Sequence, residues 1–82
     1  MDVKDILDSI KNVWLAANYF YKIEIEVGSK GSYQMSFYHD MHNVSYSEFW
    51  GNYFNTLLHN QKNFDVEIFP RSGSLILRIS PE

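Results

Sequence analysis

The 82-residue sequence contains no cysteine, no excess of positive charge and no long hydrophobic run. Without cysteine, the chain has neither a disulfide framework nor a thiolate metal site, which suits a reducing compartment. Seven Lys and Arg residues are outnumbered by ten Asp and Glu residues, so duplex nucleic acid is not an expected partner. No apolar stretch approaches the ~20 residues that span a bilayer, and residues 1–5 begin no secretory signal. We therefore expect a protein of the host cell cytosol that binds no membrane.

Glycine and proline are also scarce, with four and two residues, whereas aromatic residues make up 17% of the chain. A chain of this length forms one domain, here residues 1–82, and has no room for a second core. Its hydrophobic fraction of 45% excludes a disordered chain. The aromatic share is large enough that some rings are expected at the surface.

Residues 44–58 are predicted to form the helix around which the fold is organised. Ser45 and Glu48 are spaced as a capping box, and Val44 and Phe49 as a hydrophobic staple. At 100° per residue, one arc of this helix is apolar, and it places Trp50 in the core; its members are Tyr46, Phe49, Trp50, Tyr53, Phe54 and Leu57. Alternatively, this arc is partly exposed and is itself the binding surface, as in helices that bind in a groove. Gly51 costs a helix ~1 kcal/mol relative to alanine, which indicates a close approach, either by the first helix or by a partner.

The other elements follow from hydrophobic periodicity. A first helix begins at a cap on Asp2 and has apolar residues at helical spacing through Ala17. Strict alternation predicts strands at 21–27 and 33–38, joined by the glycine-containing turn 28–31. The second helix ends within 60–63, and alternation over 64–69 and 75–80 around the turn 70–73 predicts a second hairpin.

The fold class predicted by this order is α+β. The elements run helix, strand, strand, helix, strand, strand, and each hairpin alone would bury only one face. We therefore expect one four-stranded antiparallel sheet with both helices on one face. An offset of 43 places Ile23-Glu24-Ile25 on Val66-Glu67-Ile68, which suggests an internal repeat with units at about 1–39 and 44–82. The alternative is a small domain whose elements alternate without a repeat.

Chemical motifs are few. His39, Asp40 and His42 fall within four residues and offer ligands for a transition metal or a small molecule, although polar residues linking a strand to a helix are the ordinary explanation. No serine lies on a nucleophile elbow, and residues 28–31 lack the length and the helix of a phosphate-binding loop. We expect neither an enzyme nor a bound cofactor.

The outward face of the predicted sheet carries the candidate interaction residues. Its acids are Glu24, Glu26, Asp65 and Glu67, and its apolar side chains are Tyr38, Phe69 and Ile76. Like charges on neighbouring strands repel, which favours a role in binding a cationic partner. Alternatively, the face is merely solvated and its charges are far apart. A third interpretation is a homodimer, in which Tyr38, Phe69 and Ile76 form a symmetric interface.

The segment Met1-Asp2-Val3-Lys4-Asp5-Ile6-Leu7, with Ile10-Lys11-Asn12, resembles the first helix of small acidic phage proteins of the anti-CRISPR group. This resemblance implies an inhibitor of a larger, nucleic-acid-binding protein, and it assigns no functional residue. Our leading prediction is therefore a non-enzymatic inhibitor or adaptor that binds a larger protein through the outer sheet face. The alternatives are a metal- or ligand-binding domain that uses the loop 39–42, or a homodimeric structural protein.

Overall fold

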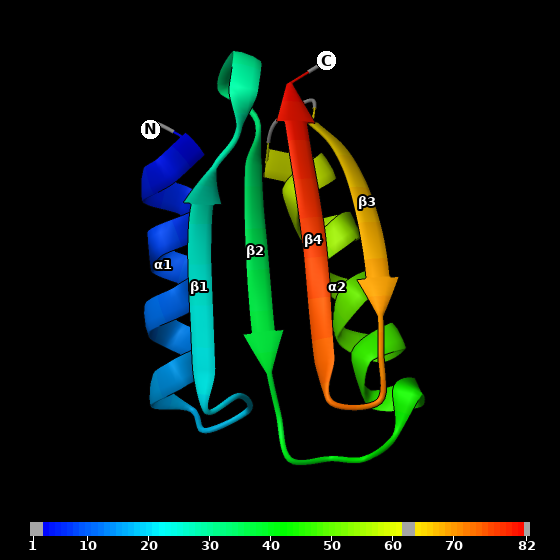
Figure 1. Ribbon diagram of the computed structural model, residues 1–82. Coiled ribbons are helices and arrows are strands. Elements are labelled where there is room, and N and C mark those ends of the chain that lie inside the picture. Colours follow the sequence, from blue (N-terminus) through cyan, green and yellow to red (C-terminus); the bar gives the residue numbers. More distant parts are fainter. Residues whose placement is uncertain (1–2, 62–63, 82) are drawn as a thin grey trace.

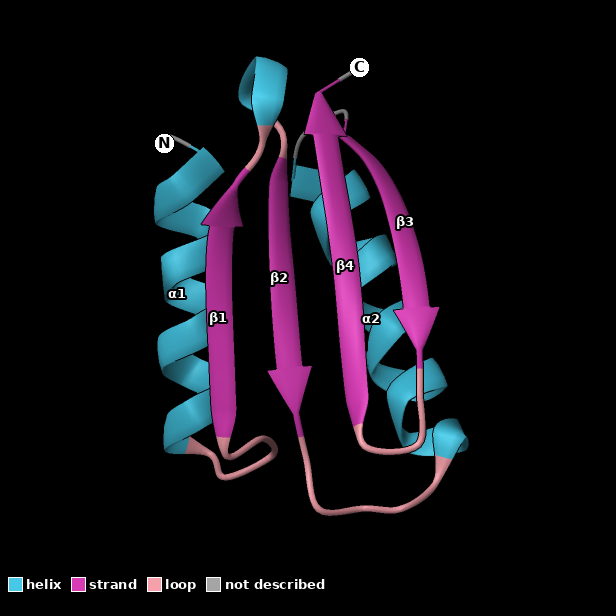
Figure 2. Ribbon diagram, viewed as in Figure 1, coloured by secondary structure: helices cyan, strands magenta, loops and turns pink. Residues whose placement is uncertain are grey.

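The computed structural model describes residues 3–61 and 64–81 as two helices behind a four-stranded sheet (Figures 1 and 2). The elements in chain order are α1 (Val3–Ala16), β1 (Lys22–Val27), the 3-10 turn η1 (Ser29–Gly31), β2 (Tyr33–Tyr38), α2 (Val44–Gln61), β3 (Phe64–Pro70) and β4 (Ser74–Pro81). The predicted α+β fold, with both helices on one face of an antiparallel sheet, is confirmed. Neither helix, over its described residues, has the length and apolarity that crossing a membrane requires.

The strand order is β1-β2-β4-β3, and every neighbouring pair is antiparallel. This order places the two helix-hairpin units on either side of an approximate two-fold axis between β2 and β4. Inward-facing Ile23 of β1 corresponds to Val66 of β3 at an offset of 43, and buried Ile10 of α1 corresponds to Phe54 of α2 at 44. Met35 of β2 and Arg78 of β4 are also 43 residues apart, but Met35 is buried and Arg78 is exposed. No single offset therefore fits all the elements, and the internal repeat stays a prediction.

The core lies between the helices and the inner sheet face, where α1 packs on β1 and α2 packs on β3 and β4. Met35 and Phe37 of β2 are fully buried, since side chains from both helices cover this central strand. The ring of Phe37 stacks on Phe54 at 4.9 Å between centroids. Phe20, which the periodicity left in a connection, is only 2% exposed and belongs to the same core.

Helix α2 is rotated relative to the prediction. Its buried stripe consists of Ser47, Gly51, Phe54 and Leu58, whereas Trp50 is only half-buried beside it. A Cβ atom on Gly51 would lie 3.1 Å from Leu75 Cδ1 and 3.4 Å from Ile68. The close approach at Gly51 therefore comes from strands β3 and β4, and neither the first helix nor a partner is needed to explain it.

The start of α2 also differs from the prediction. Asn43 Oδ1 accepts a hydrogen bond from the Ser45 backbone N–H at 2.7 Å, so Asn43 is the cap and the predicted capping box is wrong. Val44 and Phe49 are 44% and 62% exposed, which does not fit a hydrophobic staple. The predicted cap at Asp2, and Asn63 at the end of the second helix, lie outside the described residues.

Candidate functional site

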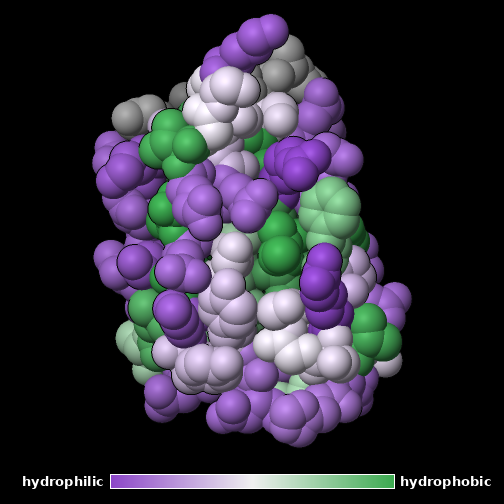
Figure 3. Space-filling view, viewed as in Figure 1, coloured by the Kyte–Doolittle hydropathy of each residue, from purple (hydrophilic) through white to green (hydrophobic). Residues whose placement is uncertain are grey.

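The outer face of the sheet is the surface to which the sequence assigned binding. Figure 3 shows it as mainly hydrophilic, with a small hydrophobic area over β4 and β3. Ile76 lies directly across from Phe69 on β3 and from Ser36 on β2. Tyr38 is two residues along β2 from Ser36, within diagonal reach of Ile76. The structure thus brings the three predicted apolar residues together on the neighbouring strands β2, β4 and β3.

The four predicted acids do not form one patch. Glu24 and Glu26 lie on β1 and Asp65 and Glu67 on β3, which are the two opposite edges of the sheet. Three strand spacings of about 4.8 Å separate these edges by roughly 14 Å, beyond the Debye length of about 8 Å at physiological ionic strength. Repulsion between the two acid pairs is therefore largely screened. Charged side chains on edge strands also prevent edge-to-edge aggregation, which explains them without a partner.

Basic side chains already occupy part of this face. Lys22 Nζ lies 3.8 Å from Glu24 and Arg78 lies 3.9 Å from Glu67. The same two cations lie over the rings of Tyr38 and Phe69, at 5.7 and 5.5 Å from the ring centroids. The cations therefore neutralise two of the four acids, Glu24 and Glu67, and cover part of the apolar area.

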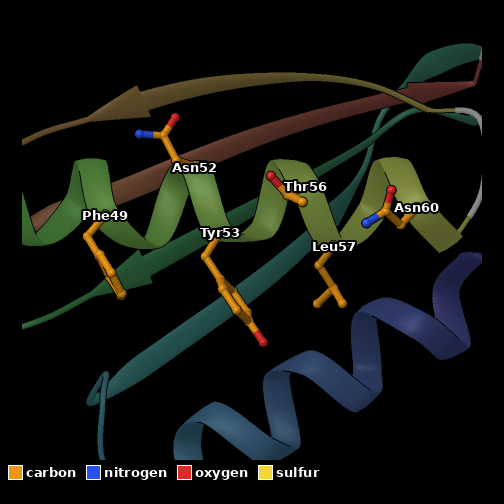
Figure 4. A pocket seen from close by; sticks show the side chains of 6 residues that line it. All are labelled: Phe49, Asn52, Tyr53, Thr56, Leu57 and Asn60. Carbon is orange, nitrogen blue, oxygen red and sulfur yellow. The ribbon is translucent and has the colours of Figure 1, made fainter.

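A second surface lies on the helical side of the molecule, on the face of α2 that does not contact the sheet. Figure 4 shows Phe49, Tyr53 and Leu57 projecting from one side of α2 in the direction of α1. Phe49 and Tyr53 are 62% and 45% exposed. Uncharged polar side chains border them along the helix and, together with them, line a hollow of about 550 Å³; they are Asn52, Thr56 and Asn60. Because all lining residues belong to one helix, the hollow is a shallow surface and not an enclosed cavity.

Trp50 lies beside this hollow, at the centre of a group of aromatic rings. Its ring lies 4.8 Å from Tyr19, 5.1 Å from Phe49 and 5.5 Å from Tyr53, measured between centroids. Trp14 of α1 meets it edge-on at 5.8 Å. We call Tyr19, Phe49, Trp50 and Tyr53 the aromatic helix surface. Its three outer rings are largely exposed, while half-buried Trp50 joins them to the core.

The leading sequence interpretation assigned the whole aromatic arc to the core and kept a partly exposed, binding arc only as its alternative. The available signal was the pair of small residues Ser47 and Gly51, one turn apart, which mark the side that approaches the sheet. When that side of the helix faces the sheet, Phe49 and Tyr53 lie more than 100° around the helix axis from it and point outward.

His39 and Ser47 form a buried polar cluster at the start of α2. Ser47 Oγ lies 2.7 Å from His39 Nε2, 2.6 Å from the Arg71 carbonyl and 3.0 Å from the Ser74 carbonyl. A hydroxyl has one hydrogen, and the carbonyls can only accept, so Ser47 donates to them and Nε2 of His39 must be the donor to Oγ. The pair resembles a catalytic dyad, but His39 does not accept the proton of Ser47. With Ser47 fully buried, the cluster is a structural link from β2 and α2 to the β3–β4 turn.

Burial lowers the pKa of His39 below its ordinary value, and the nearby charge of His42 acts in the same direction. The backbone of Met41 and the Asp40 carboxylate oppose this effect. His39 is therefore a neutral ring with its proton on Nε2 at neutral pH.

The predicted metal-ligand trio does not converge in the structure. His39 is buried and engaged with Ser47, whereas Asp40 and His42 are exposed. Within residues 3–61 and 64–81, no three His, Asp or Glu side chains come together as a metal site would require. The geometry of the described chain therefore gives no support to the metal-binding alternative.

Comparison with curated proteins and with solved structures finds no match to the chain. A family model described as "AF_0136_C: family C-terminal domain" matches residues 1–78. The match extends over almost the whole of the α+β domain, including both helices and most of the sheet. The protein therefore belongs to the AF_0136_C family of C-terminal domains.

Proposed function

We propose that this domain is a non-enzymatic binding module, an inhibitor or adaptor that docks on a larger protein through the aromatic helix surface. The observation that carries the proposal is the exposure of Tyr19, Phe49 and Tyr53 around Trp50. Tyr and Trp dominate the energetics of protein interfaces because they offer large, rigid and partly polar contact areas.

The composition of the surroundings supports this surface. Asn52, Thr56 and Asn60 border the rings and supply hydrogen-bonding groups without a charge that must be desolvated on binding. Three rings exposed to about one half present roughly 300 Å² of area, which is in the range of functional patches on monomers. A standard interface buries about 800 Å² per partner, so these rings would be the anchor of a larger contact.

The outer sheet face is the second candidate surface, favoured by the cluster of Tyr38, Phe69 and Ile76 on its middle strands and edge. Its acids would attract a basic partner, such as a protein that grips nucleic acid. We rank it second because Lys22 and Arg78 already pair with Glu24 and Glu67.

Affinity capture with matched variants tests the proposal. Phe49→Ala/Tyr53→Ala removes two rings of the aromatic helix surface, and Glu24→Gln/Glu67→Gln removes one acid from each sheet edge. We expect the first variant to lose the proteins that the wild type captures from its source cell, and the second to retain them, with both keeping a cooperative thermal transition. The reverse pattern would move the docking site to the sheet.

Sedimentation velocity addresses the homodimer. If the wild type were a dimer that Tyr38→Ala/Ile76→Ala converts to a monomer, the outer sheet face would be an interface between two copies of the chain. A wild-type dimer dissociated instead by Phe49→Ala/Tyr53→Ala would assign the aromatic helix surface to self-association and contradict a distinct partner.

A further inference from the structure

The hollow on α2 is a groove between two rows of side chains. The residues that line it are Phe49, Asn52, Tyr53, Thr56, Leu57 and Asn60 (Figure 4). Each row has a spacing of four residues; Phe49, Tyr53 and Leu57 form the apolar row, and the three short polar side chains form the other. Rows at this spacing are the ridges of a helix surface, and the groove between two of them accepts a ridge of another helix. The groove runs over about three turns, or roughly 17 Å of helix.

The outward face of α1 shows that this fold does not require exposed rings on a helix. The exposed residues of α1 are Lys4, Asp5, Ser9, Asn12, Val13 and Ala16. Four of these six are polar and none is aromatic, although α1 covers the same face of the sheet as α2. On α2, by contrast, Phe49 and Tyr53 are 62% and 45% exposed. The packing of the domain therefore does not explain the rings of the groove, whereas burial in a complex does.

A helix fits this groove better than an extended segment. A bound strand obtains much of its affinity from main-chain hydrogen bonds to a sheet edge, but the backbone groups within α2 are already paired inside the helix. A second helix also satisfies its own backbone groups and needs only side-chain contacts. None of the six lining residues is charged. The face that enters the groove must be uncharged as well, because an unpaired buried charge is costly.

Glu48 provides charge complementarity at one end of the groove. It continues the polar row, four residues before Asn52, and it is exposed. Within residues 3–61 and 64–81, Glu48 takes part in no ion pair. A Lys or Arg at the end of a bound helix can therefore pair with this carboxylate at the edge of the groove.

We propose that the groove binds an amphipathic α-helix of the partner protein. Apolar side chains of that helix, spaced three and four residues apart, lie against Phe49, Tyr53 and Leu57. A Lys or Arg at one end of the helix pairs with Glu48. This inference rests on the proposed function, because the groove shares Phe49 and Tyr53 with the aromatic helix surface.

Nuclear magnetic resonance titration of the ¹⁵N-labelled protein with a synthetic helix tests the groove. The probe is a lactam-bridged amphipathic peptide of about 15 residues, or four turns, with leucines three and four residues apart and a lysine at each end. The control peptide has the same residues in an order that spreads the leucines around the helix. We expect saturable shifts for the backbone amide of Thr56 and the side-chain amides of Asn52 and Asn60 with the probe only. Equal shifts with the control, or no shift with the probe, would overturn the proposal.

Two pairs of variants with matched charge changes sharpen the test. Thr56→Lys should weaken the probe by about 10-fold or more, because an unpaired charge would be buried in the groove, while Asn12→Lys on the exposed side of α1 should not. Glu48→Gln should weaken it by about 2- to 5-fold, the value of one exposed ion pair, while Glu24→Gln on β1 should not. Equal effects within either pair would show a response to net charge alone and contradict the site.

The affinity capture described above distinguishes this inference from the proposed function. If Phe49→Ala/Tyr53→Ala loses the captured proteins but the probe and control peptides bind equally, the docking surface stands and its occupant is not a helix. Retention of the captured proteins by that variant would overturn the docking surface and this inference with it. A wild-type dimer that Thr56→Lys dissociates would show that the groove holds α2 of a second copy, and would overturn its assignment to a partner.

Discussion

Ser47 on α2 receives a hydrogen bond from His39 at the end of β2, over 2.7 Å between Oγ and Nε2, and also contacts the carbonyls of Arg71 and Ser74 at the β3–β4 turn. The contact is buried on both sides. It fixes the tautomer of the imidazole and joins the end of β2 and the start of α2 to the β3–β4 turn, 24 to 27 residues after Ser47.

Replacement of Ser47 by alanine should destabilise the fold. Ser47→Ala leaves the N–H of His39 and the carbonyl of Arg71 without this partner, whereas the Ser74 carbonyl still accepts a hydrogen bond from the Arg71 N–H at 2.8 Å. An unsatisfied buried polar group costs about 1 to 3 kcal/mol. We expect the free energy of unfolding to fall by about 2 to 3 kcal/mol, measured by urea denaturation. Ser45→Ala, at an exposed position two residues earlier, is the control and should change it little. A neutral Ser47→Ala would show that this link adds no stability.

The lowered pKa of His39 makes stability depend on pH. Below about pH 6.5, the ordinary pKa of the group, His39 of the unfolded chain is protonated, while the ring in the folded chain is still neutral. Stability should therefore be fully present above about pH 6.5 and be lost as the pH falls through the folded pKa. The charged and titratable groups near the ring are Asp40 and His42.

Histidine proton resonances followed with pH, together with urea unfolding at pH 7.5 and 5.5, measure this effect. His42→Gln should retain the dependence and His39→Gln should reduce it. A folded His39 pKa above about 6.5 would reverse the sign and contradict the assignment of a neutral ring.

Gly51 should tolerate alanine but not a branched side chain. Gly51→Ala gains about 1 kcal/mol of helix propensity, which offsets the small shift that its Cβ requires of the Leu75 side chain at 3.1 Å. Gly51→Val adds atoms against Ile68 and Leu75 and should cost about 1 to 3 kcal/mol through overpacking. The thermal midpoint measures both, with exposed Asn52→Val as the control for the helix propensity of valine. A stable Gly51→Val protein would show that α2 does not lie this close to the sheet.

Trp50 and Phe49 should behave differently although they are neighbours. Trp50 joins the aromatic helix surface to the core, so Trp50→Ala should lower the free energy of unfolding by about 3 kcal/mol, the lower limit for buried large aromatics. Phe49 is 62% exposed, so Phe49→Ala should lower the free energy of unfolding by less than about 1 kcal/mol. Thermal melts with near-ultraviolet circular dichroism distinguish the two. An unshifted, cooperative transition for Trp50→Ala would show that this ring lies outside the core.

Much of this fold can be predicted from local sequence patterns. Alternation at Ile23, Met35 and Leu77 identifies the strands and their inner faces, because one face of each strand must be buried. The strand order cannot be predicted from alternation, since pairing β2 with β4 depends on long-range contacts. For that reason, the sequence leaves open whether the acids of β1 and β3 are neighbours, and the structure places them on opposite edges of the sheet.

The rotation of α2 and the role of His39 cannot be predicted from local sequence patterns either, because both depend on long-range contacts. A wide aromatic arc does not reveal which of its rings faces the sheet, and here small Ser47 and Gly51 occupy the closest positions. His39 follows a strand in a polar segment that is typical of a connection. It is nevertheless buried against Ser47, which the Arg71 and Ser74 carbonyls contact from a hairpin 24 and 27 residues further along the chain.

The most direct test of the proposed docking surface is hydroxyl-radical footprinting of the domain, free and bound to a captured partner. Phe49 and Tyr53 report on the aromatic helix surface, and Tyr38 and Phe69 report on the outer sheet face. We predict that partner binding protects Phe49 and Tyr53 from oxidation and leaves Tyr38 and Phe69 as reactive as in the free domain. Protection of Tyr38 and Phe69, with Phe49 and Tyr53 unchanged, would contradict the assignment of the binding surface to the helical side.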